Sequence, residues 1–373
     1  MIRRQWHYNF KIFEFKEYYE EMLLNFLELE PSIVNQIFED FKQHIYIISF
    51  PGFQRDNLLI QSILGHELGH PIADEYLKQE PKNYKYDIGV EVQKVYGSKW
   101  EGLAEGERDK KKTEIIDKIV SVRNGFISEI LSDLVASYVF NLAGLFALST
   151  YCYSEPDIDT PDIDVEDPHP AWRTRLRFVY VDFKAQDLSV LDREFSTEGV
   201  DNEFHERISE AIKRKMQEIE VTVEDTRDQT ILENDPVTRI AYRFVTEALP
   251  NMKSFLDGRV PRHRLEHHYR EVIKCARRLF EGIPPNATNE HFIYEPKIAN
   301  LQTILIGGSL YKETFLSSMP LDQGKKYRET LDQLNQLLTK ALELSLIHSE
   351  FHKHRWAEDR MYKHRRILFK RFS

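Results

Sequence analysis

The sequence predicts a mainly α fold (α+β), in which a domain with a small sheet and an active-site helix precedes an α-helical C-terminal region. Three observations support this class. Hydrophobic residues make up 41% of the 373 residues, which is enough for a core. Apolar residues recur at helical spacing through most of the chain, between breaks at proline and glycine. Few runs read as strands, and the one interpreted as a strand is rich in β-branched and aromatic residues.

The first 66 residues are expected to form two helices, a strand and a further helix that contains His66. Residues 13–39 read as two helices broken at Pro31. Residues 44–50 (HIYIISF) read as a strand, because they are β-branched and aromatic and a Pro-Gly turn follows. A helix is expected to begin at residues 56–57, where either side chain can cap it, and to run into His66.

The middle of the chain is expected to alternate between exposed and buried segments. Residues 78–112 are polar and predict a surface insertion. A long helix is expected over residues 113–151, with Asn124–Gly125 as a candidate interruption. Residues 134–154 carry no charge and approach membrane-spanning length, but polar residues are scattered among them, which favours a buried core helix. Residues 155–168 form an acidic, proline-containing loop.

Length and composition bound the organisation and the compartment. We expect two domains, one over residues 1–200 and an α-helical one over residues 201–373. The net charge of −10 argues against a general nucleic-acid binder. Two cysteines cannot form a disulfide framework, and we see no signal peptide, so the sequence predicts a cytoplasmic protein without a membrane partner.

The segment from His66 to His70 (HELGH) has the pattern H-E-x-x-H. On a helix, residues four apart lie on one face, so His66 and His70 can converge on one metal ion. Glu67 lies beside them as the candidate general base that takes a proton from the attacking water. The alternative is a surface helix with two incidental histidines, which the preceding apolar run makes less favourable.

A zinc site of this type needs a third protein ligand. Glu129 is the main candidate, because it lies just before the uncharged stretch of residues 134–154, where an unpartnered carboxylate would be costly. Asp133, one helical turn later, can accept the free N–H of a metal-bound histidine. Asp74 is the competing ligand, four residues after His70, although Pro71 predicts a kink or a helix end between them.

These motifs together resemble the gluzincin metallopeptidases. A third piece, His169-Pro-Ala-Trp-Arg173, is similar to the H-P-x-x-x-R stretch of the CAAX-prenyl-protease-like gluzincins, with two residues instead of three before the arginine, and the resemblance covers residues 44–180. It implies one Zn²⁺ per chain, with His169 over the metal as the donor to the oxyanion and Arg173 helping to place it. The chain resembles soluble relatives of these enzymes and, more distantly, the ImmA/IrrE-type peptidases.

The predicted function is that of a soluble zinc endopeptidase acting on a protein or peptide substrate. Residues 1–200 are expected to form the zinc metallopeptidase domain, and residues 201–373 an α-helical substrate-selecting or regulatory region. The alternative is a catalytically silent binding or signalling protein on the same scaffold, with a structural zinc. Retention of Glu67 favours catalysis, because a purely structural site does not need it. Residues 348–373 are basic and aromatic, and they are a weaker candidate surface for an acidic partner or nucleic acid.

Overall fold

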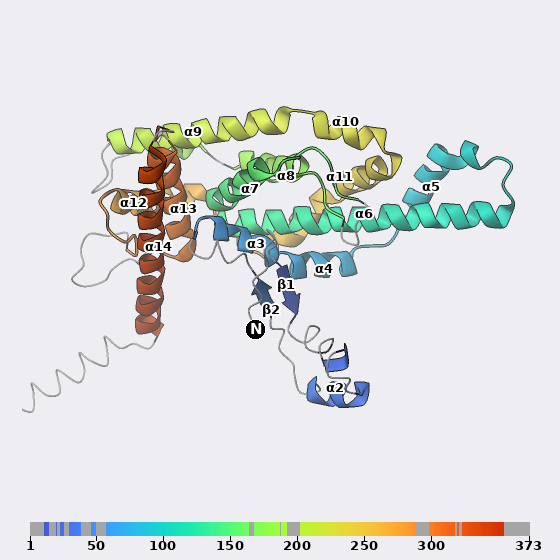
Figure 1. Ribbon diagram of the computed structural model, residues 1–373, viewed down its shortest axis with the longest axis horizontal. Helices are drawn as coiled ribbons and strands as arrows, with labels where there is room; N and C mark the ends of the chain where they lie inside the picture. The colour runs from blue at the N-terminus through green and yellow to red at the C-terminus, as the bar shows by residue number, and fades with distance from the viewer. Residues whose placement is uncertain are drawn as a thin grey trace, which may run out of the picture. The chain divides into compact units, whose positions relative to one another are not determined.

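The computed structural model describes most of the chain. The described residues are 11–14, 20, 23–25, 30–38, 46–49, 57–163, 168–186, 188–191, 202–287, 298–317, 319–320 and 323–353. Most of them are helical, as Figure 1 shows, so the prediction of a mainly α chain is confirmed.

Strands are confined to the N-terminal part of the described chain. β1 (Lys11–Glu14) pairs antiparallel with β2 (Tyr46–Ser49), with Phe13 opposite Ile47. The prediction that a helix begins at Phe13 is therefore wrong, because the backbone of residues 13 and 14 is hydrogen-bonded to β2 in a strand. The described residues from 57 onward contain isolated bridges but no strand, so the small sheet expected beside the active-site helix is not seen there.

The chain forms two compact units, and each is assembled from separated segments. The first unit comprises residues 1–136, 160–171 and 229–259, and the second comprises residues 137–159, 172–228 and 260–373. The boundary predicted near residue 200 coincides with none of these segment ends. Its functional meaning stays a prediction.

The first unit is built around the long helix α6 (Glu105–Phe140), which belongs to this unit as far as Ala136. The other elements of this unit are α2 (Pro31–Phe38), η2 (Ile60–Ile63), α3 (Leu64–Glu67), α4 (His70–Gln79), α5 (Tyr84–Tyr96), η3 (Gly97–Trp100), most of α10 (Arg227–Asn234) and α11 (Pro236–Asp257). Residues 78–112, predicted as an insertion, are largely exposed but mainly helical, in α4, α5, η3 and α6.

Buried apolar residues of α6 form much of the core of this unit. Ile119, Phe126 and Ile130 are fully buried. The Arg123 side chain is also buried, where it donates to both carboxylate oxygens of Glu80 just after α4 and covers the ring of Tyr84. This ion pair holds the end of α4 against α6.

Two predictions about α6 are wrong. The helix continues through Asn124 and Gly125, and it ends at Phe140, inside the stretch predicted as one buried helix. Asn141 has a φ of 47°, and its side chain accepts a hydrogen bond from the Leu142 N–H at the start of α7 (Leu142–Ser154). Within the described residues, no helix is long and apolar enough to cross a membrane.

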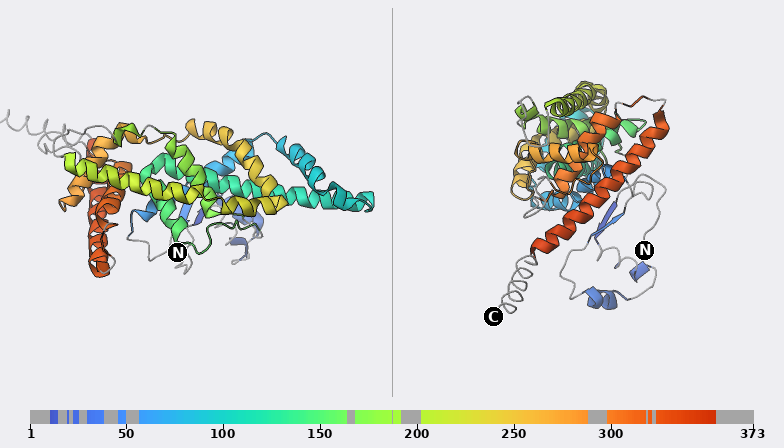
Figure 2. Two further views of the ribbon diagram at one scale, coloured as in Figure 1. Left: turned by 90° about the horizontal axis from the view of Figure 1, so that it is seen from above. Right: turned by 90° about the vertical axis from the view of Figure 1, so that its left-hand side faces the viewer.

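The second unit is also helical. Its other elements are α8 (Trp172–Lys184), η4 (Ser189–Leu191), α9 (Asn202–Glu224), α12 (Leu265–Phe280), α13 (Leu301–Tyr311), the π-helical η5 (Lys312–Leu316) and α14 (Gly324–Lys353). α14, which Figure 2 shows as one uninterrupted helix, buries Leu334, Leu338 and Ala341 on one face. Cys152 and Cys275 are free and buried, and burial raises the pKa of each thiol to about 12.

Candidate metal centre

The two histidines of the H-E-x-x-H motif lie on either side of a local change in helix hydrogen bonding. α3 ends at Glu67 and α4 begins at His70, with Pro71 in its first turn. Pro71 has no N–H to donate to the Glu67 carbonyl, which explains why the regular helix stops there, as the sequence predicted. Leu68 and Gly69 nevertheless keep right-handed helical dihedral angles. The rings of His66 and His70 therefore stay together, with centroids 4.7 Å apart.

Helix α6 brings Glu129 to this histidine pair. One carboxylate oxygen, Oε2, lies 3.5 Å from Nε2 of His66, and the other, Oε1, lies 3.8 Å from Nε2 of His70. Adjacent ligands of a tetrahedral zinc ion with bonds near 2.0–2.1 Å lie about 3.4 Å apart. The three groups are thus close to the spacing that one zinc ion requires.

The other nitrogen of each ring is held by α6. Nδ1 of His66 lies 2.8 Å from Oδ1 of Asp133, and Nδ1 of His70 lies 3.1 Å from the Ser128 hydroxyl. A carboxylate accepts, so the bond to Asp133 places a proton on Nδ1 of His66, and in the neutral ring Nε2 then carries the lone pair. Nε2 is the nitrogen directed toward Glu129, and its lone pair is what a metal needs.

Gly69 allows α6 to approach this closely. A Cβ atom on Gly69 would lie 2.4 Å from Cα and 2.8 Å from Cβ of Ser132, distances at which atoms overlap. Sequence reasoning did not identify Gly69 or Ser128 as part of the site. The glycine inside HELGH was the available signal, since glycine costs about 1 kcal/mol within a helix.

His169 reaches the same carboxylate from the loop before α8. Its Nε2 lies 3.5 Å from Oε1 of Glu129, and 43% of its side chain is exposed. The main chain of His169 forms a two-bond bridge with Asp162, at 2.9 and 2.8 Å. The loop therefore holds His169 through its backbone, and its imidazole faces Glu129.

Two other carboxylates, those of Glu67 and Asp74, are alternative candidates for the third ligand position. Glu67 is buried, and its oxygen lies with nitrogens of His66 and His70 in a group whose atoms are all within 4.8 Å of one another. We favour Glu129 as the ligand, because its two oxygens approach the Nε2 atoms that the Nδ1 hydrogen bonds orient. Neither Glu129 nor Asp74 belongs to this group, but Asp74 is exposed on α4, whereas Glu129 is buried against both rings.

Arg173 lies in the second unit, within a network of its own. Its guanidinium donates to Asp159 and to the Thr222 carbonyl, and its Nη1 lies 3.7 Å from Asp225. The side chain is only 2% exposed. Its predicted role in placing His169 stays a prediction. Asp159, which the sequence placed in an acidic loop, is its partner.

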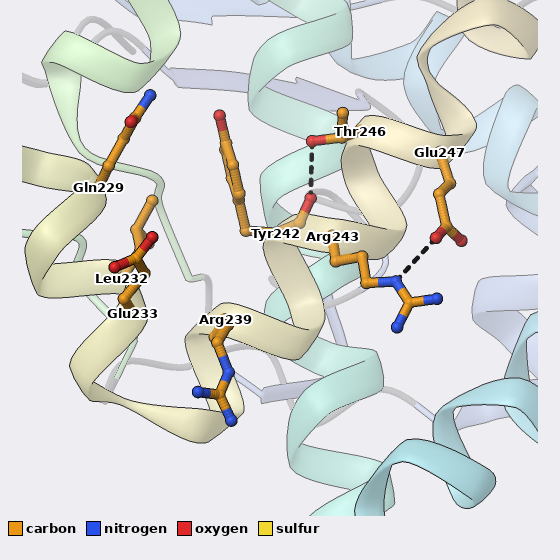
Figure 3. A pocket seen from close by; sticks show the side chains of 8 residues that line it. All are labelled: Gln229, Leu232, Glu233, Arg239, Tyr242, Arg243, Thr246 and Glu247. Atoms are coloured by element: carbon orange, nitrogen blue, oxygen red, sulfur yellow. Dashed lines mark hydrogen bonds and ion pairs between the residues drawn. The ribbon is translucent and has the colours of Figure 1, made fainter. Parts of the chain in front are cut away.

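The centre opens to solvent, and it is separate from a groove described between two other helices of the first unit. His70 retains 22% exposure of its side chain, and the neighbouring Leu68 is 48% exposed. A groove of about 540 Å³ lies between α10 and α11 instead (Figure 3). In it Arg243 pairs with Glu247 at 2.9 Å, and none of the predicted site residues lines it.

The candidate partner surface at residues 348–373 falls largely outside the described residues, which end at 353.

In comparisons with protein-family models, with curated proteins and with solved structures, nothing matches the chain.

Proposed function

We propose that the chain is a zinc-dependent endopeptidase whose metal is held by His66, His70 and Glu129. The observation that carries this proposal is the placement of both Nε2 atoms at 3.5–3.8 Å from the Glu129 carboxylate, with Nδ1 of His66 on Asp133. Two nitrogens and one oxygen suit zinc and leave one coordination position open.

The charges at the site support a cation there. Glu67, Glu129 and Asp133 are 6%, 3% and 2% exposed, so three carboxylates are buried around two imidazoles. Buried carboxylates are costly unless a countercharge or hydrogen bonds compensate them. A divalent ion would supply that countercharge, and the tautomer fixed by Asp133 prepares His66 to bind it.

The remaining residues can carry out peptide hydrolysis. Zinc would act as a Lewis acid toward water and the substrate carbonyl. Glu67 accepts the proton of the attacking water while the water oxygen bonds to the carbonyl carbon, and it returns this proton to the leaving nitrogen as the C–N bond breaks. His169 donates a hydrogen bond to the oxygen on which negative charge develops.

Exposure favours catalysis over a structural metal. Structural zinc sites are closed by four protein ligands, whereas catalytic sites keep a position for water. Here 43% of the His169 side chain and 22% of the His70 side chain are exposed, so the proposed open position can be reached from solvent.

The test combines metal content with hydrolysis. Protein purified without added metal should contain one zinc per chain by elemental analysis and should cleave an internally quenched peptide library. The matched control is Glu67→Gln, which keeps the size of the side chain but cannot accept the proton. It should retain zinc and fold while losing cleavage.

The result separates the two functions. Zinc in both proteins with cleavage only in the wild type supports the peptidase. Zinc in both with no cleavage in either would favour the structural-metal alternative, and equal cleavage by both would contradict Glu67 as the general base. Absence of zinc from the wild type would contradict the proposal.

A further inference from the structure

A glycine lies in the middle of α6, the longest of the described helices, where glycine has an energetic cost. Gly125 is the twenty-first residue of α6, and the helix continues on both sides of it. Glycine in a helix interior costs about 1 kcal/mol relative to alanine. Gly106, near the start of the same helix, has open space around its α-carbon, but Gly125 does not.

The main chain of Pro168 occupies the space beside Gly125. A Cβ atom on Gly125 would lie 2.4 Å from the Pro168 carbonyl oxygen and 3.1 Å from its Cδ. Contacts of this kind are ordinarily no shorter than 3.4 Å. The carbonyl would therefore have to move by about 1 Å to accommodate a methyl group, and the main chain next to it would have to move as well.

Pro168 immediately precedes His169, so this contact places a residue of the proposed centre. Gly125 is one helical turn before Glu129 on the same face of α6. His169 Nε2 lies 3.5 Å from Oε1 of Glu129. The main chain of His169 also forms two hydrogen bonds with the main chain of Asp162, with N···O distances of 2.9 and 2.8 Å. The segment is thus fixed against α6 on one side and against Asp162 on the other.

We propose that Gly125 is a positioning residue for His169. Because glycine has no side chain, the main chain of Pro168 can pack directly against α6, and this contact sets the distance from His169 to the reacting carbonyl. The proposal rests on the proposed peptidase function. A displacement of 1 Å at a catalytic group costs about 10²-fold in rate. The Gly125→Ala variant should therefore lose turnover of that order while retaining zinc, whose ligands lie on α3, α4 and α6.

The first experiment compares Gly125→Ala with Gly106→Ala in the full chain. Both changes add one methyl group to α6, but only the first meets Pro168. We expect unchanged zinc content in both, and kcat on a quenched peptide about 10²-fold lower in Gly125→Ala, with KM changed far less. We expect long-range ¹H–¹⁵N spectra of the histidine rings, recorded on metal-free protein, to show His169 displaced only in Gly125→Ala.

A double-mutant cycle tests whether Gly125 acts through His169. In a His169→Ala background, the Gly125→Ala change should have no further effect on kcat, because the group it displaces is absent. An additional 10²-fold loss in that background would overturn the proposal. So would an unshifted His169 resonance, or equal kcat values for Gly125→Ala and Gly106→Ala.

A second perturbation covers the case in which Gly125→Ala does not fold. Asp162→Pro removes the N–H that donates to the His169 carbonyl, whereas Asp162→Ala keeps it and changes only an exposed side chain. Only the proline variant should shift the His169 resonance and lower kcat. If wild type and Glu67→Gln cleave equally, the proposed function fails, while the resonance comparison still decides whether Gly125 positions His169.

Discussion

Removal of the Asp133 carboxylate should weaken zinc binding, because Asp133 orients the ring of His66 and is not itself a proposed ligand. The Nδ1–Oδ1 distance is 2.8 Å, and the His66 and Asp133 side chains are 8% and 1% exposed, so water does not readily replace this bond. Loss of a carboxylate that orients a metal-bound histidine typically lowers metal affinity 10–100-fold. We therefore expect Asp133→Ala to raise the Kd for zinc by that factor, or about 1.4–2.7 kcal/mol.

Two control variants should lose less zinc affinity than Asp133→Ala. Asp133→Asn keeps an acceptor but removes the charge, so its loss should be smaller than that of alanine. Ser128→Ala removes a neutral partner of His70 at 3.1 Å in a less buried position, and it should cost less than tenfold. Competition with a fluorescent zinc chelator measures Kd, and circular dichroism of the metal-free proteins checks the fold. Equal losses for Asp133→Ala and Ser128→Ala, or no loss in Asp133→Ala, would refute the reasoning.

Three further predictions concern the ligand set, the core and acid stability. Glu129→Ala should lose bound zinc and Asp74→Ala should keep it, by elemental analysis; the reverse result would make Asp74 the third ligand. Arg123→Met should lower the free energy of unfolding by about 3 kcal/mol in urea titrations, because it leaves the Glu80 carboxylate buried without its partner; a change below 1 kcal/mol would contradict this. Burial, and then the neighbouring His268, lower the pKa of His263 from its ordinary 6.5 to about 4. Between these values the unfolded chain binds the proton and the folded chain does not, so stability falls as pH drops from 6.5 to 4, by at most about 3 kcal/mol. His263→Phe should remove much of that fall, and an unchanged pH profile would assign acid sensitivity to other groups.

The motif residues could be found from the sequence because their chemistry is local or periodic. Four-residue spacing in a helix is enough to predict that His66 and His70 share a face, and the same holds for Glu129 and Asp133. A missing proline N–H predicts the interruption before α4 without any tertiary information. The structure brings these four residues together, and it adds His169 from a separate loop.

The contacts between segments could not be predicted in the same way. Gly125 resembled a helix interruption, because glycine is a poor helix former whatever lies beside it. Its partner, Pro168, is 43 positions away, and only the packing shows that the glycine accommodates a neighbouring main chain. Conversely, Asn141 has no strong breaking signal within its apolar surroundings, yet it ends α6 with a φ of 47°.

The interleaving of the two units has a consequence for biosynthesis. The first unit receives His169 in a segment of residues 160–171, which begins only after residues 137–159 have been made for the second unit. The ribosome adds roughly 5–20 residues per second, so the interval between Asp133 and His169 is about 2–7 s. The nascent chain thus carries the three proposed zinc ligands and Glu67 before His169, the proposed donor to the oxyanion. The order of synthesis would therefore let the proposed metal ligands emerge from the ribosome before the proposed site is complete.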